Sequence, residues 1–261
     1  MKKYTKWGLL LILAIVFAGC GKTVQVDEKT DNSLVKVKEK GVMTLGTYSD
    51  FSPMEFVDEN GKIVGFDIDL MNAIVSEIGV SAELKEYAWE DIFEGVKSNE
   101  VDVIISGITI TPERAEQMLF SVPYVNAGQS IIVKKGNSTI KGPEDLKDKK
   151  VAVLTGTTSE EAAHEYVDDA SNVIGYSAYE EIRPDLTSGK VDVWINDLAA
   201  AVNNVKDNPG WEIVGEPFTQ EFYGIATNLE NQILMDEINR ILRDMKRDGR
   251  LEDLEAKWLK K

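Results

Sequence analysis

The chain has 261 residues, a formal net charge of −16 and a single cysteine. The acidic balance argues against nucleic acid as a partner, because phosphate backbones are bound by clustered Lys and Arg. One cysteine rules out an internal disulfide, and the length suits one large domain or two of about 100–130 residues.

The N-terminus has the features of an export signal. Met1–Lys6 is basic, and Trp7–Phe17 is an apolar run too short to remain in a bilayer. Small residues then lead into Cys20, a pattern that resembles a bacterial lipobox, although Phe17 stands where leucine is usual. An ordinary signal peptide is the alternative. We expect a signal peptide at residues 1–19, lipid attachment at Cys20 and a location on the extracytoplasmic face of the cell membrane.

The segment after the cysteine is polar and has no apolar period. Residues 20–33 are rich in Lys, Asp, Glu and Thr, which predicts a flexible tether. No later apolar run approaches the roughly 20 residues of a transmembrane helix. The sequence thus predicts a folded part that is held at the membrane surface without spanning it.

From Leu34 onward, short β-branched runs alternate with amphipathic segments, which favours sheets of parallel strands covered by helices. The expected strands are Val42–Leu45, Ala82–Glu86, Val101–Ile105, Ile131–Lys134, Val151–Leu154, Asn172–Tyr176, Val191–Ile195 and Tyr223–Ala226. The expected helices are Asp67–Ile78, Trp89–Lys97, Pro112–Met118, Glu160–Val167, Ile182–Thr187, Leu198–Lys206, Gln232–Arg247 and Leu251–Leu259.

Two parts of this alternation resemble each other. The helix–turn–strand unit 90–105 repeats ninety residues later as 180–195, with a Val-Asp-Val strand in each copy. The segments 42–47 and 151–156 form a second pair. Chance similarity between such units is the alternative, but the common order favours two lobes of similar topology with a cleft between them.

Ligands of open α/β sheets bind at the carboxyl ends of strands, beside helix N-termini. The segments at these ends come from both lobes, and we expect them to face one another when the lobes close about a hinge. They are Tyr48–Phe51, Ser106–Thr109, Thr155–Ser159 and Asn196–Asp197.

The segment before and including Arg114 has the residues of an anion site. Thr111 and Pro112 predict the start of a helix, whose N-terminal amides attract an anion. Arg114 lies in the first turn, where its guanidinium can bind a carboxylate through two parallel hydrogen bonds. A solvated arginine in an ordinary turn is the alternative.

The other lobe carries a comparable segment and a charge of opposite sign. Gly156–Ser159 precedes a helix but lacks the Lys of a phosphate-binding loop, so it does not indicate a nucleotide. Asp197 would bind an ammonium group or merely cap the helix that follows it. A cation in one lobe and a carboxylate in the other would match a zwitterion. Phe51 and Trp89 either flank a ligand side chain or belong to the core.

Three motifs in order resemble the bacterial extracellular solute-binding proteins of family 3, the polar amino-acid binders of ABC importers. They are Gly65–Leu70, Ser106–Arg114 and Phe120–Tyr124, and the resemblance extends over residues 34–261. It implies an α/β, two-lobed fold of the type II periplasmic-binding-protein kind, in which each lobe is a mostly parallel sheet covered by helices.

The same resemblance implies how the lobes are divided. Two crossing hinge strands are expected near Val125–Gln129 and Glu221–Gly224. Residues 34–125 and 223–261 would then form lobe 1, and residues 126–222 would form lobe 2.

The resemblance also implies roles for single residues. Arg114 would bind the α-carboxylate, with Thr109 and Thr158 donating beside it. Asp197 would bind the α-ammonium, helped by the Gly107 carbonyl and the Thr109 hydroxyl. The full set of expected ligand-binding residues is Tyr48, Phe51, Trp89, Ser106, Gly107, Thr109, Arg114, Thr158, Asn196 and Asp197.

Ligand preference is less sharply defined by the motifs. Tyr48 stands where many histidine, lysine–arginine and glutamine binders carry an aspartate. Asp50 and Glu55 are nearby, and their loop resembles loops of some arginine binders. The expected ligand is therefore a free polar L-amino acid, with arginine or lysine favoured ahead of glutamine.

An enzyme or a ligand sensor on the same fold is the alternative. His164 is the sole histidine and is predicted in mid-helix, so the chain has no zinc motif or nucleophile elbow. A dehydratase acting on prephenate or arogenate would need a general acid, for which Asp197 or Glu55 would serve. We expect instead a monomer without enzymatic activity, cofactor or metal that delivers its ligand to the permease of an ABC importer.

Overall fold

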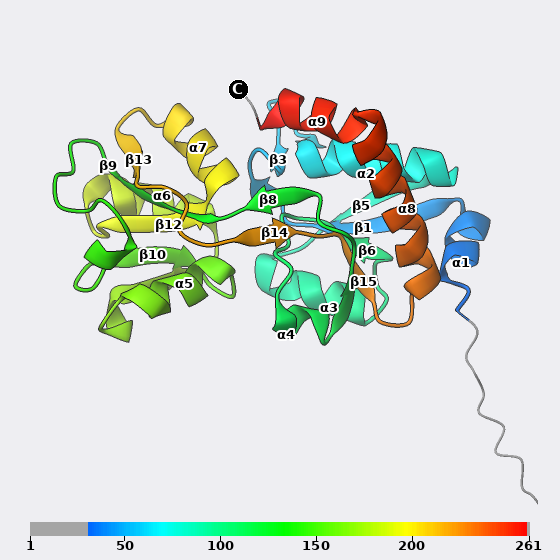
Figure 1. Ribbon diagram of the computed structural model, residues 1–261, viewed down its shortest axis with the longest axis horizontal. Helices are drawn as coiled ribbons and strands as arrows, with labels where there is room; N and C mark the ends of the chain where they lie inside the picture. The colour runs from blue at the N-terminus through cyan, green and yellow to red at the C-terminus, as the bar shows by residue number, and fades with distance from the viewer. Residues whose placement is uncertain (1–30, 260–261) are drawn as a thin grey trace, which may run out of the picture. The chain divides into compact units, whose positions relative to one another are not determined.

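The computed structural model describes residues 31–259. The predicted signal peptide, Cys20 and most of the predicted tether lie outside them. Two five-stranded sheets form the centres of two lobes, and two short strands cross between the lobes (Figure 1).

The first sheet has the order β5-β1-β6-β15-β7. β1 pairs in parallel with β5 and β6, whereas β15 pairs antiparallel with β6 and β7. The strands are β1 Val42–Thr47, β5 Ser81–Glu86, β6 Val103–Ile104, β7 Met118–Phe120 and β15 Ala226–Asn228.

The second sheet has the order β11-β10-β12-β9-β13. β10 pairs in parallel with β11 and β12, and β9 pairs antiparallel with β12 and β13. The strands are β9 Gln129–Lys134, β10 Val151–Leu154, β11 Val173–Tyr176, β12 Val193–Asp197 and β13 Trp211–Val214.

The two sheets share one topology, which explains the repeat in the sequence. In each lobe a buried central strand is flanked by two parallel neighbours, and then by an antiparallel strand that continues from a crossing strand. β1 and β10 are buried at nearly every position, as central strands of covered sheets must be. The expected two-lobed α/β fold is confirmed. The sheets are mixed, with two parallel and two antiparallel pairings each, because one strand of each enters from the opposite lobe.

The crossing strands are β8 Val125–Ala127 and β14 Glu221–Tyr223, which pair antiparallel between the two sheets (Figure 1). β8 leads into β9 of the second sheet, and β14 leads back into β15 of the first. Both lie where the sequence predicted them. Next to the first sheet, a small three-stranded sheet consists of β2 Asp50–Phe51, β3 Glu55–Val57 and β4 Ile63–Val64.

Helices cover both sheets. In Figure 1, α2, α8 and α9 lie on one side of the first sheet and α3 on the other, while α5 and α7 lie on opposite sides of the second. The helices are α1 Ser33–Lys40, α2 Phe66–Ile78, α3 Ile92–Lys97, α4 Pro112–Ala115, α5 Thr158–Tyr166, α6 Tyr179–Ser188, α7 Leu198–Asp207, α8 Gln232–Asp248 and α9 Arg250–Trp258. Short 3₁₀ turns occur at Trp89–Asp91, Pro143–Asp145 and Ala170–Asn172.

Several boundaries differ from the sequence predictions. The strand expected at Tyr223–Ala226 is divided, because Tyr223 ends β14 and Ala226 begins β15. The helix expected over 112–118 ends at Ala115, because Met118 already belongs to an edge strand of the first sheet. The predicted tether does not extend to Ser33, which begins α1. Asp31 and Ser33 accept hydrogen bonds from the amides of Ile233 and Leu234 at the start of α8, and thereby fix this end of the segment to lobe 1.

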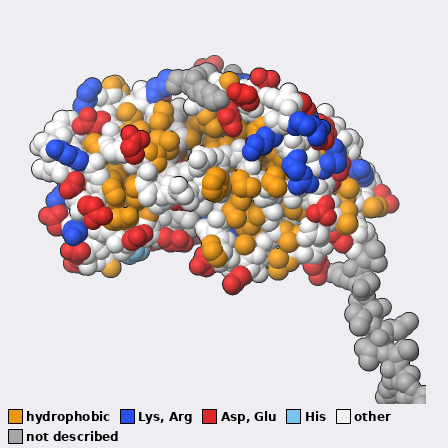
Figure 2. All heavy atoms as spheres, viewed as in Figure 1, with side chains coloured by type: hydrophobic (Ala, Val, Ile, Leu, Met, Phe, Trp, Pro, Cys, Tyr) orange, Lys and Arg blue, Asp and Glu red, His pale blue; other side chains and the backbone are white. Residues whose placement is uncertain are grey.

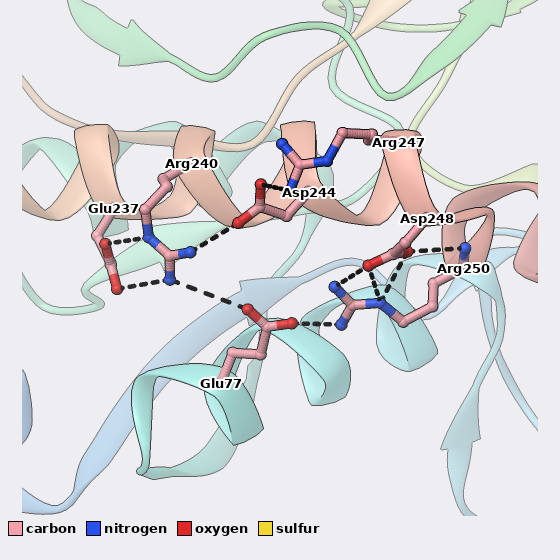
Figure 3. Close-up of polar contacts among 7 residues, drawn as sticks. All are labelled: Glu77, Glu237, Arg240, Asp244, Arg247, Asp248 and Arg250. Carbon is pink, nitrogen blue, oxygen red and sulfur yellow. Dashed lines mark hydrogen bonds and ion pairs between the residues drawn. The ribbon is translucent and has the colours of Figure 1, made fainter.

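An ion-pair network joins three helices of lobe 1 (Figure 3). Glu77 of α2 pairs with Arg240 of α8 and with Arg250 of α9. Arg240 also pairs with Asp244 at 2.8 Å. Single surface pairs contribute only about 0–1 kcal/mol, but a network that links separate helices fixes their relative positions.

Figure 2 shows two surface features of the face of the molecule that is turned to the viewer in Figure 1. Basic side chains gather over α8, although the chain as a whole is acidic. Hydrophobic side chains gather over the crossing strands, where Phe222 is exposed.

Candidate functional site

A cavity lies between the lobes, with about 300 Å³ of space between its atoms, part of it open to solvent. Its lining residues come from both sheets: Tyr48, Phe51, Trp89, Ser106, Gly107, Thr109, Arg114, Thr157, Thr158, Tyr179 and Asp197.

Strand ends place most of these residues. Tyr48 follows β1, Ser106 follows β6, and Asp197 is the last residue of β12. Thr158 begins α5, shortly after the end of β10. The carboxyl ends of the central strands therefore meet at the cavity, as expected for open α/β sheets.

Arg114 reaches across the cavity from lobe 1. Its Nη1 donates to the carbonyl of Thr109 at 3.0 Å, and its Nη2 donates to the carbonyl of Gly156 in lobe 2 at 3.2 Å. The guanidinium carbon lies 4.9 Å from the centre of the Phe93 ring. Burial lowers the pKa of Arg114, but the nearby carboxylates of Glu161 and Asp197 oppose that shift. Since a guanidinium has five N–H donors, these two bonds leave others for a ligand anion.

The short helix α4, which contains Arg114, does not supply the expected anion site at its N-terminus. α4 is a single turn, and its cap Thr111 accepts a hydrogen bond from the Arg114 amide at 3.3 Å. One turn aligns too few peptide dipoles for a strong positive end. Among the described residues of lobe 1 that line the cavity, Arg114 carries the positive charge.

Asp197 provides the opposite charge from lobe 2. It is 7% exposed, and its Oδ1 accepts a hydrogen bond from Gln129 Nε2 at 3.1 Å. Burial and the negative charge of Glu221 raise the pKa of Asp197 to about 7, while hydrogen bonds limit the shift. Its side chain caps no amide of α7, so the alternative explanation as a helix cap is not supported by the geometry.

The side-chain hydroxyls of Thr109 and Thr158, which line the cavity, both donate to the carboxylate of Glu221. Glu221 Oε2 accepts from Thr109 Oγ1 at 3.0 Å and from Thr158 Oγ1 at 2.7 Å. A hydroxyl has one proton, so these bonds leave each threonine oxygen as an acceptor, and Thr158 Oγ1 already accepts from Gln129 Nε2 at 3.2 Å. Both threonines are thus arranged to accept from an ammonium group. The sequence analysis expected Thr109 beside both ligand charges and Thr158 beside the carboxylate; here both hydroxyls donate to Glu221.

Gly107 forms part of the cavity floor beneath an aromatic ring. Its φ of 54° lies in the left-handed region, and a Cβ at this position would be 2.3 Å from Phe51 Cε1. Only glycine fits both the backbone conformation and the close approach of the ring.

Aromatic rings enclose the other end of the cavity. Phe51 stacks on Tyr179 of lobe 2 with centroids 5.8 Å apart, and Tyr48 lies edge-on to Trp89 at 6.4 Å. Trp89 Nε1 donates to the carbonyl of Gly156 across the lobes at 3.2 Å. Such ring faces attract apolar groups and cations.

One predicted site residue and two suggested acids lie elsewhere. Asn196 is fully buried away from the cavity, because neighbouring residues of β12 point to opposite faces and Asp197 takes the cavity side. Asp50 pairs with Arg183 of lobe 2 at 3.0 Å, and Glu55 is buried beneath the floor. Neither acid lines the cavity.

The sequence placed the segment Thr155–Ser159 at the cavity without singling out Thr157, and it gave no binding role to Tyr179, Gln129 or Glu221. A signal for Tyr179 was present, because the ninety-residue repeat aligns it with Trp89. Gln129 and Glu221 lie at the ends of the predicted crossing strands, but polar residues of a hinge carry no motif of their own.

No group of three or more His, Cys, Asp and Glu side chains within residues 31–259 has the arrangement of a metal site. His164 is exposed on α5. No helix in the same range is long and apolar enough to cross a membrane.

Comparison with known proteins gives consistent matches. Residues 43–261 match the bacterial extracellular solute-binding proteins, family 3. The L-cystine-binding protein TcyJ of Escherichia coli strain K12 is 32% identical over 98% of this chain and 97% of its own length. The ABC transporter glutamine-binding protein GlnH of Bacillus subtilis strain 168 is 33% identical over 100% of this chain and 98% of its own. A solved ancestral arginine-binding protein bound to arginine is 46% identical, with a TM-score of 0.80 over 84% of this chain and 98% of its own.

Proposed function

The chain belongs to the bacterial extracellular solute-binding proteins of family 3, and we propose that it captures one free L-amino acid and delivers it to the permease of an ABC importer. The relatives TcyJ and GlnH are named as binding proteins for amino acids, and GlnH as part of an ABC transporter. The site pairs the positive charge of Arg114 with the carboxylate of Asp197. Binding a ligand that carries both charges, without converting it chemically, explains this pairing.

One observation carries the proposal: Arg114 of lobe 1 and Asp197 of lobe 2 line the same cavity. The guanidinium matches an α-carboxylate, and the carboxylate matches an α-ammonium. Thr109 and Thr158 add hydroxyl oxygens whose protons are already donated to Glu221. These groups together fit the two charges that all free amino acids share.

Lobe closure would complete the site. Polar contacts between described residues join the lobes around the cavity, among them Asp50–Arg183, Ser52–Asn203, Trp89–Gly156 and Arg114–Gly156. Entry of a ligand requires that these contacts open, and β8 and β14 are the two places where the chain crosses between the lobes. We infer a hinge at these strands and a closed form that presents both lobes to the permease.

The aromatic end of the cavity favours a basic side chain. Tyr48, Phe51, Trp89 and Tyr179 offer ring faces to a guanidinium or ammonium group, each contact contributing about 0.5–2 kcal/mol. The arginine-bound ancestral structure supports the same choice. We propose arginine as the first ligand to test and glutamine as the second.

The site of action would be the outer face of the cell membrane. A lipid on Cys20 would hold the protein there, and residues between Cys20 and α1 would separate it from the bilayer. Metabolic labelling with a radioactive fatty acid tests this anchor, since labelling should disappear in Cys20→Ala and persist in the wild type. Equal labelling of both would contradict it.

A thermal-melt screen of the purified protein tests the function. The twenty amino acids, ornithine, citrulline and cystine would be added one at a time. A ligand at a thousandfold over its Kd adds roughly 4 kcal/mol, which raises the Tm by on the order of 10 °C for a protein of this size. Arginine should give the largest shift. A largest shift with a neutral amino acid would contradict the basic preference, and no shift with any of them would contradict amino-acid capture.

A further inference from the structure

Two acidic side chains lie directly beneath the floor of the cavity. Glu55 of β3 and Asp67 of α2 are both 0% exposed. Neither lines the cavity, and neither has a role in holding the ligand as described above.

Both carboxyl groups hold the backbone and side chains of the floor. Glu55 Oε1 accepts from Ser106 Oγ at 2.6 Å, and Ser106 Oγ accepts in turn from the Tyr48 amide at 3.0 Å. Asp67 Oδ2 accepts from the amide of Gly107 at 2.8 Å. Glu55 therefore fixes Ser106 directly and Tyr48 through Ser106, and Asp67 fixes Gly107.

Each acid also has one oxygen that the described residues leave without a donor. These atoms are Glu55 Oε2 and Asp67 Oδ1, and both are buried. The carboxyl groups of Glu55 and Asp67 lie within hydrogen-bonding reach of each other, so two ionised carboxylates there would repel each other and would lack solvation. A single proton between the two groups removes one charge and supplies the missing hydrogen bond. We propose that Glu55 and Asp67 share one proton, and that this acid pair is the positioning element for the ligand-binding floor at Ser106 and Gly107.

The electrostatic surroundings agree with this arrangement. Burial, followed by the charge of Asp67, raises the pKa of Glu55 well above its ordinary value. Burial raises the pKa of Asp67 to about 7, although the Gly107 amide and the Tyr124 hydroxyl oppose the shift. The other titratable groups that face the pair are the phenols of Tyr124 and Tyr179. Burial raises the pKa of each phenol well above 10, so both stay neutral below pH 9.

A shared proton has a consequence with a definite sign. A carboxyl whose pKa is raised by folding stabilises the protein at low pH, and this contribution is lost as the pH rises through the folded-state pKa. Loss of the proton as the pH rises through that pKa would leave two buried charges under the floor. Stability and ligand affinity should therefore both decrease as the pH rises.

The first test needs no ligand. The Tm of the purified protein is measured from pH 6 to 9 for the wild type and for Glu55→Gln, whose amide keeps the shape and a donor but cannot ionise. The wild-type Tm should fall by roughly 3–5 °C per pH unit above the pKa of the pair, and the variant should lack this part of the decrease. Asp67→Asn, which can donate to Glu55, is a second variant with the same expected result. Exposed Glu59→Gln, from the turn after β3, is the control and should follow the wild type.

If the Tm depends on pH in the same way in the wild type, in Glu55→Gln and in Asp67→Asn, the proposal of a shared proton is overturned. The positioning role rests on the proposed function and has its own readout, the Kd of L-arginine at pH 7 and pH 8.5. Affinity should weaken more between these values in the wild type than in Glu55→Gln, while the ammonium of arginine titrates alike against both. Equal weakening would overturn the positioning role. If arginine does not bind, the proposed ligand fails, and the melting curves still decide whether the proton is shared.

Discussion

The pH dependence of ligand binding follows most directly from the burial of Asp197. This side chain is 7% exposed, and burial together with the charge of Glu221 raises its pKa to about 7. An ammonium group binds the ionised form, so affinity should fall as the pH drops below 7. At pH 5 only about one molecule in a hundred would have Asp197 ionised, which weakens binding about 100-fold, or by roughly 2.7 kcal/mol.

Isothermal titration with L-arginine between pH 5 and 8 measures this loss. Asp197→Asn is the matched variant, because it keeps the shape and an acceptor oxygen but has no charge to lose. It should bind more weakly at pH 7.5 by about 1.5–3 kcal/mol and should show no comparable loss toward pH 5. A wild-type affinity that is equal at pH 5 and pH 7 would refute the assignment of Asp197 to the ammonium group.

Three further substitutions test other contacts of the site. Arg114→Ala should weaken binding by about 2–5 kcal/mol in the same titration, because a desolvated ligand carboxylate loses its partner; unchanged affinity would contradict its role. Gly107→Ala forces a Cβ to within 2.3 Å of the Phe51 ring at a positive φ, and should lower both the Tm and the affinity, with a cost of about 1–3 kcal/mol seen in thermal unfolding. Arg183→Ala removes a half-exposed pair with Asp50 between the lobes, so affinity should fall by less than about 1 kcal/mol, and a larger loss would mean that the pair contacts the ligand.

Periodicity was sufficient to predict the elements that position the site. Long amphipathic segments such as 232–247 and buried runs such as Val151–Leu154 gave helices and strands close to those observed, because their patterns extend over several turns or residues. The two-residue strands β2 and β4 were missed because so short a segment has no period. They form only through pairing with neighbours, which a single sequence does not specify.

The site was predicted where one residue carries the chemistry by itself. Arg114 and Asp197 stand at strand or helix ends with charges that suggest their partners. Glu221 was missed because its importance arises from its contacts with hydroxyls of both lobes, which only the fold brings together. The direction of the Glu55 side chain could not be predicted from the sequence; its carboxyl accepts from Ser106 below the floor and does not line the cavity.

The pairing of Arg114 with the ligand carboxylate is tested most directly by changing both partners. Binding of L-arginine and of L-arginine amide, which lacks the carboxylate, is measured by titration to the wild type and to Arg114→Ala. Removal of the carboxylate should cost the wild type at least tenfold more in affinity than it costs the variant, a coupling of about 1.4 kcal/mol or more. Equal costs in both proteins would mean that Arg114 does not hold the carboxylate, and would contradict the proposed recognition of a free amino acid.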